Sequence, residues 1–281
     1  MKNKTPVNIP AEKLHPFEGH PFKVLDNEEM NQLTQSIQEL GILSPLIVRP
    51  KENTADEYEI VSGHRRFRAA VKAGMREIPA FVVPMDRDAA AIALVDSNLH
   101  REHLLPSEKA FAYKLKMDAM RHQGTSCQVG TKFRSDEQLA ENTSDSARQI
   151  QRYIRLTYLI PELLQKVDEG QIAFTPAVEL SYLTGQEQEI LLSEMEYADC
   201  TPSLSQAIRL HRFSREGRLS GDVAYAVMSE EKANQKEKLK IPAERVRKFF
   251  PKDYTAAQME EEIVKMCESR YRKRQRDRDS R

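Results

Sequence analysis

Residues 26–41 carry the first clear hydrophobic periodicity in the chain. Apolar side chains recur at spacings of three, four and three, at Met30, Leu33, Ile37 and Leu40. This spacing predicts an amphipathic helix with one buried face. Asp26 is the expected N-cap, and Gly41 follows where a helix end favours glycine.

The next part of the chain alternates short strand-like runs with helical stretches. Apolar runs at 46–48 and 58–61 are separated by polar residues, which predicts a hairpin. A helix is expected over 65–73, a strand over 80–83, and an alanine-rich helix after Asp86. This alternation predicts a small mixed α/β domain at the N-terminus.

Strand signals stop after that domain, and short helical patterns follow each other. We expect an all-α domain over residues 105–215, which begins with a helix capped by Ser107. Residues 216–281 are expected to form a polar hinge and a helical C-terminal region, with a last amphipathic helix over 255–271. The predicted fold class is α+β and mostly helical, with the strands confined to an N-terminal domain of residues 1–104.

The composition narrows the functional classes. Of 281 residues, 40% are hydrophobic, which supports ordinary cores and argues against global disorder. The 43 basic residues are balanced by 43 acidic ones, so any attraction to nucleic acid must come from local patches. Three distant cysteines without a C-x-x-C pair indicate a reducing compartment and no structural zinc. No apolar run is long enough to cross a bilayer and no signal peptide is present, so we expect a cytoplasmic protein without membrane attachment.

Residues 136–156 have the pattern of a helix-turn-helix. A short helix with Leu139 and Ala140 inward is followed by a polar turn, and Ser146 can cap a second helix. The apolar face of the second helix consists of Ala147, Ile150 and Ile154. The candidate DNA-contacting residues are Ser146, Arg148, Gln149, Gln151, Arg152 and Arg155. Arginine and glutamine on such a helix suit base edges and phosphates in a major groove. A helical hairpin with a solvated basic face is the alternative interpretation.

A glycine- and arginine-rich segment follows the second predicted strand. Glycine at a strand–helix junction allows close approach of backbone to a ligand, and the N-terminus of a helix favours anions. Arginines add forked donors that match phosphate. The candidate phosphate-binding residues are Gly63, His64, Arg65, Arg66 and Arg68. The alternative is a basic helix start in solvent.

Residues 96–104 form a third polar group. Asn98, Arg101 and one carboxylate can meet a metal-bound polyphosphate, because magnesium prefers oxygen ligands together with phosphates. Asn98 is the candidate magnesium ligand. A polar helix end without a ligand is the alternative.

In this order and spacing, the three groups resemble the ParB family of partition proteins over roughly residues 9–215. G-I-L-S-P-L at 41–46 is similar to the family's G-x-x-x-Q-P box, which adds Gly41, Ser44 and Pro45 to the candidate nucleotide site. G-H-R-R-F-R-A at 63–69 is similar to its G-E-R-R-x-R-A box. S-N-L-H-R at 97–101 is similar to its E-N-x-Q-R box.

The resemblance implies a function for each part of the chain. The three boxes would form a CTP pocket with magnesium, and the helix-turn-helix would read an inverted-repeat, centromere-like site on double-stranded DNA. CTP would close a homodimer into a clamp on DNA, with the C-terminal domain holding the dimer together. A ParA-type ATPase partner and association with the nucleoid or a plasmid are also implied.

The boxes depart from the family pattern at three positions. Ser44 stands in place of glutamine, His64 in place of glutamate, and Ser97 in place of the glutamate that helps to hold magnesium and supports hydrolysis. The resemblance therefore implies CTP binding, whereas even weak CTPase activity is in doubt. F-T-P-A at 174–177 also replaces a G-H-A segment of the family, so recognition of the DNA site is expected to differ.

Two other functions remain open from the sequence. The first is a helix-turn-helix transcription regulator without nucleotide gating, and the second is a small-molecule kinase of the ParB-like fold. A sulfiredoxin is disfavoured because residues 63–65 contain no cysteine. The basic tail, residues 270–281, is expected either to contact DNA phosphates or to be a solubilising end.

Overall fold

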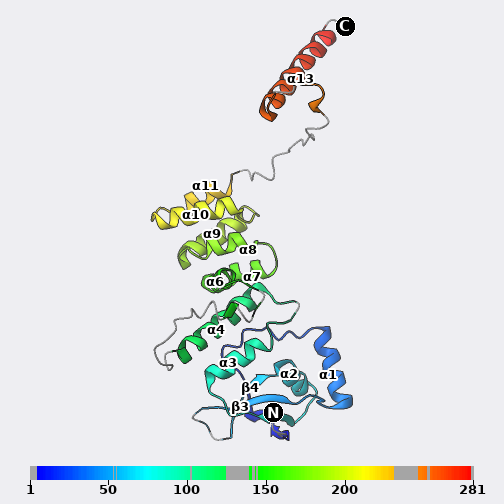
Figure 1. Cartoon of the computed structure of the whole chain (residues 1–281), viewed down its shortest axis with the longest axis vertical. Helices are drawn as coiled ribbons and strands as arrows, with labels where there is room; N and C mark the ends of the chain where they lie inside the picture. Colours follow the sequence, from blue (N-terminus) through cyan, green and yellow to red (C-terminus); the bar gives the residue numbers. More distant parts are fainter. Residues whose placement is uncertain are drawn as a thin grey trace. The chain divides into compact units, whose positions relative to one another are not determined.

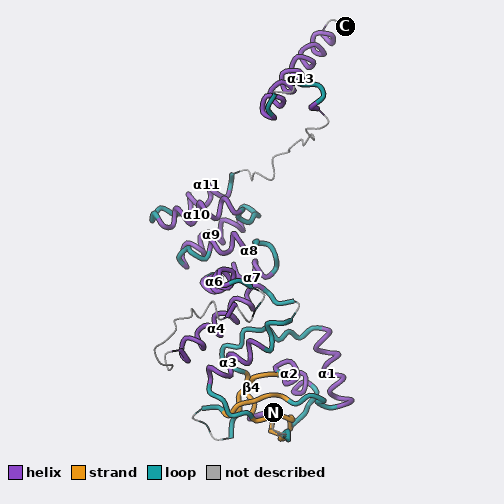
Figure 2. The backbone as a smooth tube through the Cα atoms, viewed as in Figure 1, coloured by secondary structure: helices purple, strands orange, loops and turns teal. Residues whose placement is uncertain are grey.

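The computed structural model describes residues 5–52, 54, 56–101, 103–124, 139–140, 143, 145–230, 246–251 and 254–279. The chain divides into two compact units, Met1–Glu230 and Glu231–Arg281. In the first unit all strands lie towards the N-terminus, and only helices follow (Figure 1). The predicted fold class, α+β and mostly helical with a small N-terminal sheet, is confirmed (Figure 2).

A five-stranded sheet organises the N-terminal part. The strands are β1 (Val7–Pro10), β2 (Leu14–Pro16), β3 (Leu46–Pro50), β4 (Tyr58–Ser62) and β5 (Glu77–Val82). Their spatial order is β1-β5-β3-β4-β2, with β3 antiparallel to β4 and parallel to β5. The predicted hairpin is therefore confirmed as β3 and β4. The pattern did not predict β1 and β2, because each is too short to show an alternation and each contains a proline.

Three α-helices accompany the sheet, and a short 3-10 helix, Ala11–Lys13, joins its first two strands. The α-helices are α1 (Glu28–Leu40), α2 (His64–Lys72) and α3 (Arg87–Asp96). The core of this part includes Met30, Ile37, Leu46, Ile60 and Ile78, each nearly inaccessible to solvent. Its residues come from α1, α2 and the strands, so the helix that the periodicity predicted contributes its buried face to this core.

The structure corrects two details of α1. Asn27, and not Asp26, is the N-cap, because its side chain accepts a hydrogen bond from the backbone N–H of Met30 at 3.1 Å. Asp26 instead pairs with Arg68 of α2 at 2.8 Å. Leu40 does not belong to the buried stripe, since 63% of it is exposed. Gly41 ends the helix at φ 70°, as predicted.

The rest of the first unit consists of helices around a second core. They are α4 (Pro106–Gly124), α6 (Ala147–Arg155), a 3-10 turn (Leu156–Tyr158), α7 (Pro161–Asp168), α8 (Phe174–Leu180), α9 (Gly185–Tyr197), α10 (Leu204–Arg215) and α11 (Gly221–Met228). Helix α4 packs against α3 on one side and α6 on the other. Ser107 is not its cap, because the Ser107 hydroxyl donates to Asp168 at 2.6 Å. Since α4 begins at Pro106, Glu108 lies in its first turn, where its carboxylate accepts from the backbone N–H of Leu105, the residue before the helix, at 3.0 Å.

The beginning of the predicted hinge is ordered. Residues 221–228 form α11, whose Ala224, Val227 and Met228 are buried in the second core. Gln206 of α10 supports this packing by donating its amide to the Val227 carbonyl at 2.8 Å. The sequence predicted a hinge here because two glycines and several polar residues surround these apolar positions. Residues 231–240 of the predicted hinge lie outside the described residues.

The second unit contains one long helix, α13 (Ala256–Asp279). The predicted helix ended at Tyr271, but arginine, lysine and glutamine are good helix formers and the helix continues through them. Met259 is buried, whereas Met266 is exposed, so the predicted stripe is buried only at its start. None of the described helices is long and apolar enough to cross a membrane.

A buried ion pair fastens the β3–β4 hairpin, which carries the chain into α2. Arg49 of β3 and Glu59 of β4 meet at 2.7 Å with side chains only 5% and 7% exposed. Glu59 also accepts from the backbone N–H of Glu18 at 3.0 Å, and Glu52 pairs with Arg49 at 2.8 Å. The hydrogen bonds to these carboxylates raise the pKa of Arg49 against the opposing effect of burial.

We expect Glu59→Gln to lower the free energy of unfolding by about 3 kcal/mol, because it leaves a buried guanidinium without its main counter-charge. Glu57→Gln removes a half-exposed partner of Lys51 and should cost less than about 1 kcal/mol. Urea unfolding of both variants measures the difference. Equal losses would show that the buried pair does not fasten the hairpin.

Candidate functional site

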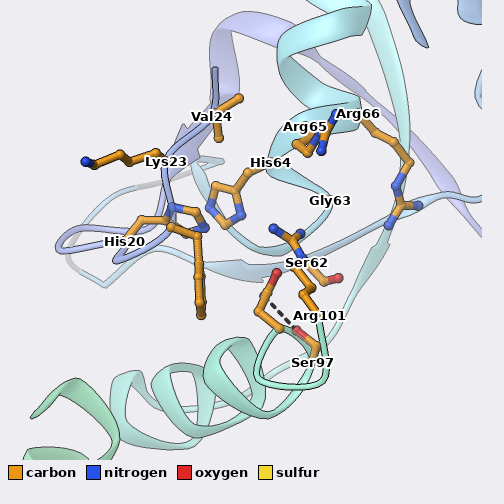
Figure 3. A pocket seen from close by; sticks show the side chains of 12 residues that line it. His20, Lys23, Val24, Ser62, Gly63, His64, Arg65, Arg66, Ser97 and Arg101 are labelled. Atoms are coloured by element: carbon orange, nitrogen blue, oxygen red, sulfur yellow. Dashed lines mark hydrogen bonds between the residues drawn. The ribbon is translucent and has the colours of Figure 1, made fainter. Parts of the chain in front are cut away.

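A cavity of about 240 Å³ opens at the N-terminus of α2 (Figure 3). Three separate stretches of the chain meet there, at 20–24, 62–66 and 97–101. Of the predicted nucleotide-site residues, those that line it are Gly63, His64, Arg65, Arg66, Asn98 and Arg101. The second and third polar groups of the sequence therefore lie together in space, although more than thirty residues separate them.

Gly63 makes the turn from β4 into α2. Its φ is 106°, a left-handed conformation that residues with a Cβ rarely adopt. A Cβ there would lie 3.0 Å from Cγ of Leu46 and 3.2 Å from Nη2 of Arg66. The turn directs the start of α2 at the cavity, and the first N–H groups of a helix have no partner within the helix. Glycine is therefore required at this position by both conformation and space.

Arg66 is held by the loop that precedes β3. Its Nη1 donates to the backbone carbonyl of Ser44 and, at 3.0 Å, to that of Pro45. Burial lowers the pKa of the Arg66 guanidinium. Ser44 and Pro45 do not line the cavity themselves, so the structure gives them a role in orienting an arginine that does.

Two predicted residues lie away from the cavity. Gly41 is not among its lining residues, and its contribution is the end of α1. Arg68 is on the exposed side of α2, where it pairs with Asp26. Arg65 does line the cavity and pairs with Glu29 of α1 at 2.8 Å, with both side chains in contact with solvent.

Two histidines, His20 and His64, pack against each other in the cavity wall, with ring centroids 3.8 Å apart and ring planes tilted by 38°. Burial, together with the nearby His20 and Arg101, lowers the pKa of His64 to about 3. Burial likewise lowers the pKa of His20 to about 4, with a hydrogen bond to the Phe22 backbone opposing and Arg101 contributing. Nε2 of His64 accepts from the backbone N–H of Phe17 at 3.3 Å. A neutral His64 that accepts at Nε2 carries its proton on Nδ1 and is a donor there.

Asn98 is oriented by its neighbours on the other side of the cavity. Its amide nitrogen donates to the carbonyl of Leu94 at 2.7 Å and to the hydroxyl of Ser97 at 3.1 Å. The amide oxygen is thereby left as the acceptor that a ligand can use. Asp96 does not line the cavity, because its carboxylate pairs with Lys116 of α4.

Sequence reasoning missed His20, Phe22, Lys23 and Val24, which form one wall of the cavity. They lie in an irregular segment without hydrophobic periodicity, so no pattern could place them near residues 62–66. Lys23 also joins the cavity to the helical part of the unit. Its backbone N–H donates to Glu108 at 2.7 Å, and its ammonium pairs with the largely buried Asp168 of α7 at 2.8 Å.

The predicted recognition helix is present as α6. Ser146 is its N-cap, with the hydroxyl accepting from the backbone N–H of Gln149 at 3.3 Å, and Ile150 is fully buried. Leu139 of the preceding predicted helix is also buried. The other residues of that helix, 136–138 and 141–142, lie outside the described residues.

The turn before α6 is fixed to α4. The hydroxyl of Tyr113 donates to Asp145 at 2.6 Å, and Lys109 pairs with the same carboxylate at 3.2 Å. Burial, together with this carboxylate, raises the pKa of Tyr113, so the phenol stays a donor. Helix α6 is therefore held in place from its N-terminal end.

The three arginines of α6 have different surroundings. Arg148 is exposed and has no hydrogen bond or ion pair with any residue that the structure describes. Arg152 donates to Thr175 at 2.9 Å and lies 4.9 Å from the ring centroid of Phe174.

Arg155 is enclosed by neighbouring helices. It lies 4.0 Å from the ring centroid of Tyr182 and 4.4 Å from that of Tyr158, and it donates to the carbonyl of Ser181 at 2.7 Å. The ring contacts and the hydrogen bond therefore engage the guanidinium of Arg155 within the protein. Among the glutamines, Gln149 accepts from Arg152 at 3.1 Å, and Gln151 is exposed.

Comparison with known proteins identifies relatives for most of the chain. Residues 1–99 match the family described as the ParB N-terminal domain. The chromosome-partitioning protein Spo0J of Thermus thermophilus is 33% identical over 204 residues, which cover 72% of this chain and 70% of that protein. The nucleoid occlusion protein of Listeria innocua is 33% identical over 192 residues, covering 68% of this chain but only 62% of the relative.

Among solved structures, the C-terminally truncated ParB of Caulobacter crescentus complexed with CTP-gamma-S is 29% identical. The alignment covers 63% of this chain and 92% of that one, with a TM-score of 0.33.

The paired histidines predict a dependence of stability on pH. Both pKa values lie below the ordinary 6.5 in the folded state, so between about pH 6.5 and pH 4 the unfolded chain binds protons that the folded chain does not. The free energy of unfolding should therefore fall as the pH is lowered through this range, by up to about 1.4 kcal/mol per pH unit for each histidine.

His64→Gln should flatten that slope, whereas His103→Gln, at an exposed histidine, should leave it unchanged. Urea unfolding at pH 7, 6 and 5 gives the slopes. The same slope in the wild-type chain and His64→Gln would disprove the assignment.

Proposed function

This chain belongs to the ParB family of partition proteins, and on that premise we propose that it is a DNA-binding partition protein whose N-terminal pocket binds CTP. The family membership confirms the resemblance seen in the three boxes. The observation that carries the proposal is that residues of two boxes line one cavity while the third box orients Arg66 from behind it. We assign nucleotide binding to residues 1–104 and DNA binding to residues 105–215.

The cavity suits a polyphosphate. Three arginines, Arg65, Arg66 and Arg101, line it together with the N-terminus of α2, whereas the ammonium of Lys23 points away from them and pairs with Asp168 (Figure 3). Guanidinium groups donate paired hydrogen bonds to phosphate oxygens, and the free N–H groups of a helix N-terminus favour anions. The neutral His64 adds a donor at Nδ1. The phosphates are therefore bound by cations and backbone donors from both sides of the cavity.

The family also implies magnesium, and the donors in this cavity do not fit a protein-bound ion. Magnesium in proteins is usually bound through one or two carboxylates besides phosphates. The described lining residues offer the amide oxygen of Asn98 and two serine hydroxyls, and no carboxylate. No group of three or more metal-ligating side chains occurs in the part of the chain that the structure describes. We therefore assign no step of nucleotide binding to magnesium.

We propose that α6 enters the major groove with its N-terminal half. Arg148 and Gln151 are exposed there, and Gln149 and the cap Ser146 are close to them. Arg152, which donates to Thr175, lies at the edge of the surface proposed to face DNA. Arg155 was predicted to contact DNA, but its contacts with Tyr158, Tyr182 and Ser181 support a role in positioning α6.

The link through Lys23 supports communication between the two sites. Lys23 lines the cavity, and its ammonium pairs with Asp168 in the helical part that contains α6. A homodimer is part of the proposal, because a palindromic DNA site mirrors two-fold symmetry. A ParA-type ATPase partner rests on family membership alone.

Arg65→Ala should weaken CTP binding by about 1.5–3 kcal/mol, since it removes a charged hydrogen-bond donor from the cavity. Arg68→Ala is the matched control on the same helix, because Arg68 lies outside the cavity and should leave the affinity unchanged. Calorimetric titration with CTP, and with ATP, GTP and UTP as competitors, measures both. No binding of any nucleotide to the folded wild-type chain would favour a helix-turn-helix regulator without nucleotide gating.

Arg148→Ala should weaken specific DNA binding by about 1–3 kcal/mol without changing the melting temperature, because the side chain is exposed on α6. Arg155→Ala should instead lower the melting temperature, because it removes packing between two tyrosines. Fluorescence anisotropy on a palindrome selected from random DNA, together with thermal unfolding, separates the two effects. Undiminished binding by Arg148→Ala would remove this residue from the DNA interface.

A further inference from the structure

We infer that this pocket holds its nucleotide without a divalent cation. The inference rests on the proposed CTP site and concerns how the charge of the phosphates is balanced there. In most nucleotide sites a magnesium ion bound partly by carboxylates supplies the positive charge. Here the protein itself supplies it through Arg65, Arg66 and Arg101.

The arrangement of these cations favours a bare polyphosphate. Arg66 is fixed by two backbone carbonyls, and Arg101 lies 5.8 Å from the ring centroid of Phe22. Burial lowers the pKa of both guanidinium groups, and the charge of nearby Arg65 also lowers that of Arg101 while Glu108 opposes this. Adding a divalent cation to such a cluster costs electrostatic energy, whereas adding an anion relieves it.

Among the described residues, the carboxylates of Glu29, Asp96 and Glu108 lie near this part of the chain and are committed to other partners. Both oxygens of Glu108 accept backbone N–H groups, from Lys23 at 2.7 Å and from Leu105 at 3.0 Å. Glu29 pairs with Arg65, and Asp96 pairs with Lys116. None of these three lines the cavity. A metal ion would have to take its ligands from the nucleotide, from water and from neutral side chains of the cavity, among them one amide oxygen and two serine hydroxyls.

On the opposite wall, His64 adds a donor rather than a ligand. Figure 3 shows His20 and His64 side by side, next to the turn at Gly63. Since Nε2 of His64 is occupied by the Phe17 N–H, the nitrogen left for a ligand is the protonated Nδ1. A protonated imidazole nitrogen donates to phosphate oxygens and cannot bind a metal. Both walls of the cavity therefore present donors to the phosphates.

Calorimetric titration of the full chain with CTP, once in magnesium chloride and once in EDTA, tests the inference. We expect dissociation constants that agree within about threefold, or tighter binding in EDTA, because free CTP is the more negative ligand. Binding that is tenfold or more weaker in EDTA would overturn the inference. Absence of CTP binding in both buffers would reject the proposed function itself, and the two failures are therefore distinguishable.

A pair of variants tests the effect of a carboxylate beside Asn98. Ser97→Glu adds a magnesium ligand at the cavity wall and should make CTP binding stronger in magnesium than in EDTA, by about tenfold. Ser97→Gln, of nearly the same size but uncharged, should show no such difference between the buffers. A metal dependence in both variants, or in neither, would contradict the claim that the missing carboxylate removes the need for the ion. Melting temperatures in both buffers confirm that the variants are folded.

Discussion

The left-handed turn at Gly63 is the constraint on which the arrangement of this molecule depends. The chain leaves a central strand there and enters α2 within one residue, against the side chains of Leu46 and Arg66. A strand end, a helix N-terminus and an arginine are brought to the same point. The backbone of this turn therefore sets the position of the cavity, and the basic side chains surround it. Any residue with a Cβ at this position would have to move either the core or the arginine.

The second feature is the continuity between the cavity and the helical part of the unit. Lys23, Glu108 and Asp168 form a polar chain that runs from the cavity wall through the start of α4 to the end of α7. Helix α4 then carries Tyr113 and Lys109, which fix the turn before α6 through Asp145. One helix and a few hydrogen bonds therefore connect the cavity with α6, the helix proposed to contact DNA.

Much of this could be predicted from the sequence, because the relevant signals are local. The spacing of Met30 and Ile37 predicts α1, and the cap at Ser146 predicts the start of α6. The choice of Asn27 over Asp26 as cap could not be predicted, since both side chains are suitable and Asp26 is drawn to Arg68 by the tertiary fold. The sequence also did not predict that Ser44 and Pro45 accept hydrogen bonds from Arg66 through their backbone carbonyls, because this depends on how the loop before β3 folds.

Residues in irregular segments were beyond prediction for a different reason. His20 and Lys23 belong to a loop whose position is fixed by distant partners, so their sequence neighbours carry no signal for the cavity. For Arg155 the periodic pattern correctly predicted a place on the helix, but it did not predict that the side chain is half-buried. It lies on the predicted helix, yet Tyr182, a residue on a different part of the chain, covers it. Patterns locate elements well, whereas contacts between elements decide which side chains meet a ligand.

Hydrogen–deuterium exchange of the full chain with and without CTP tests most directly whether this cavity is the nucleotide site. The account predicts that CTP slows exchange of the backbone amides at 63–67 and 97–101, with no direct effect within α13. Protection confined to other segments, or unchanged exchange at 63–67 when CTP is bound, would contradict it.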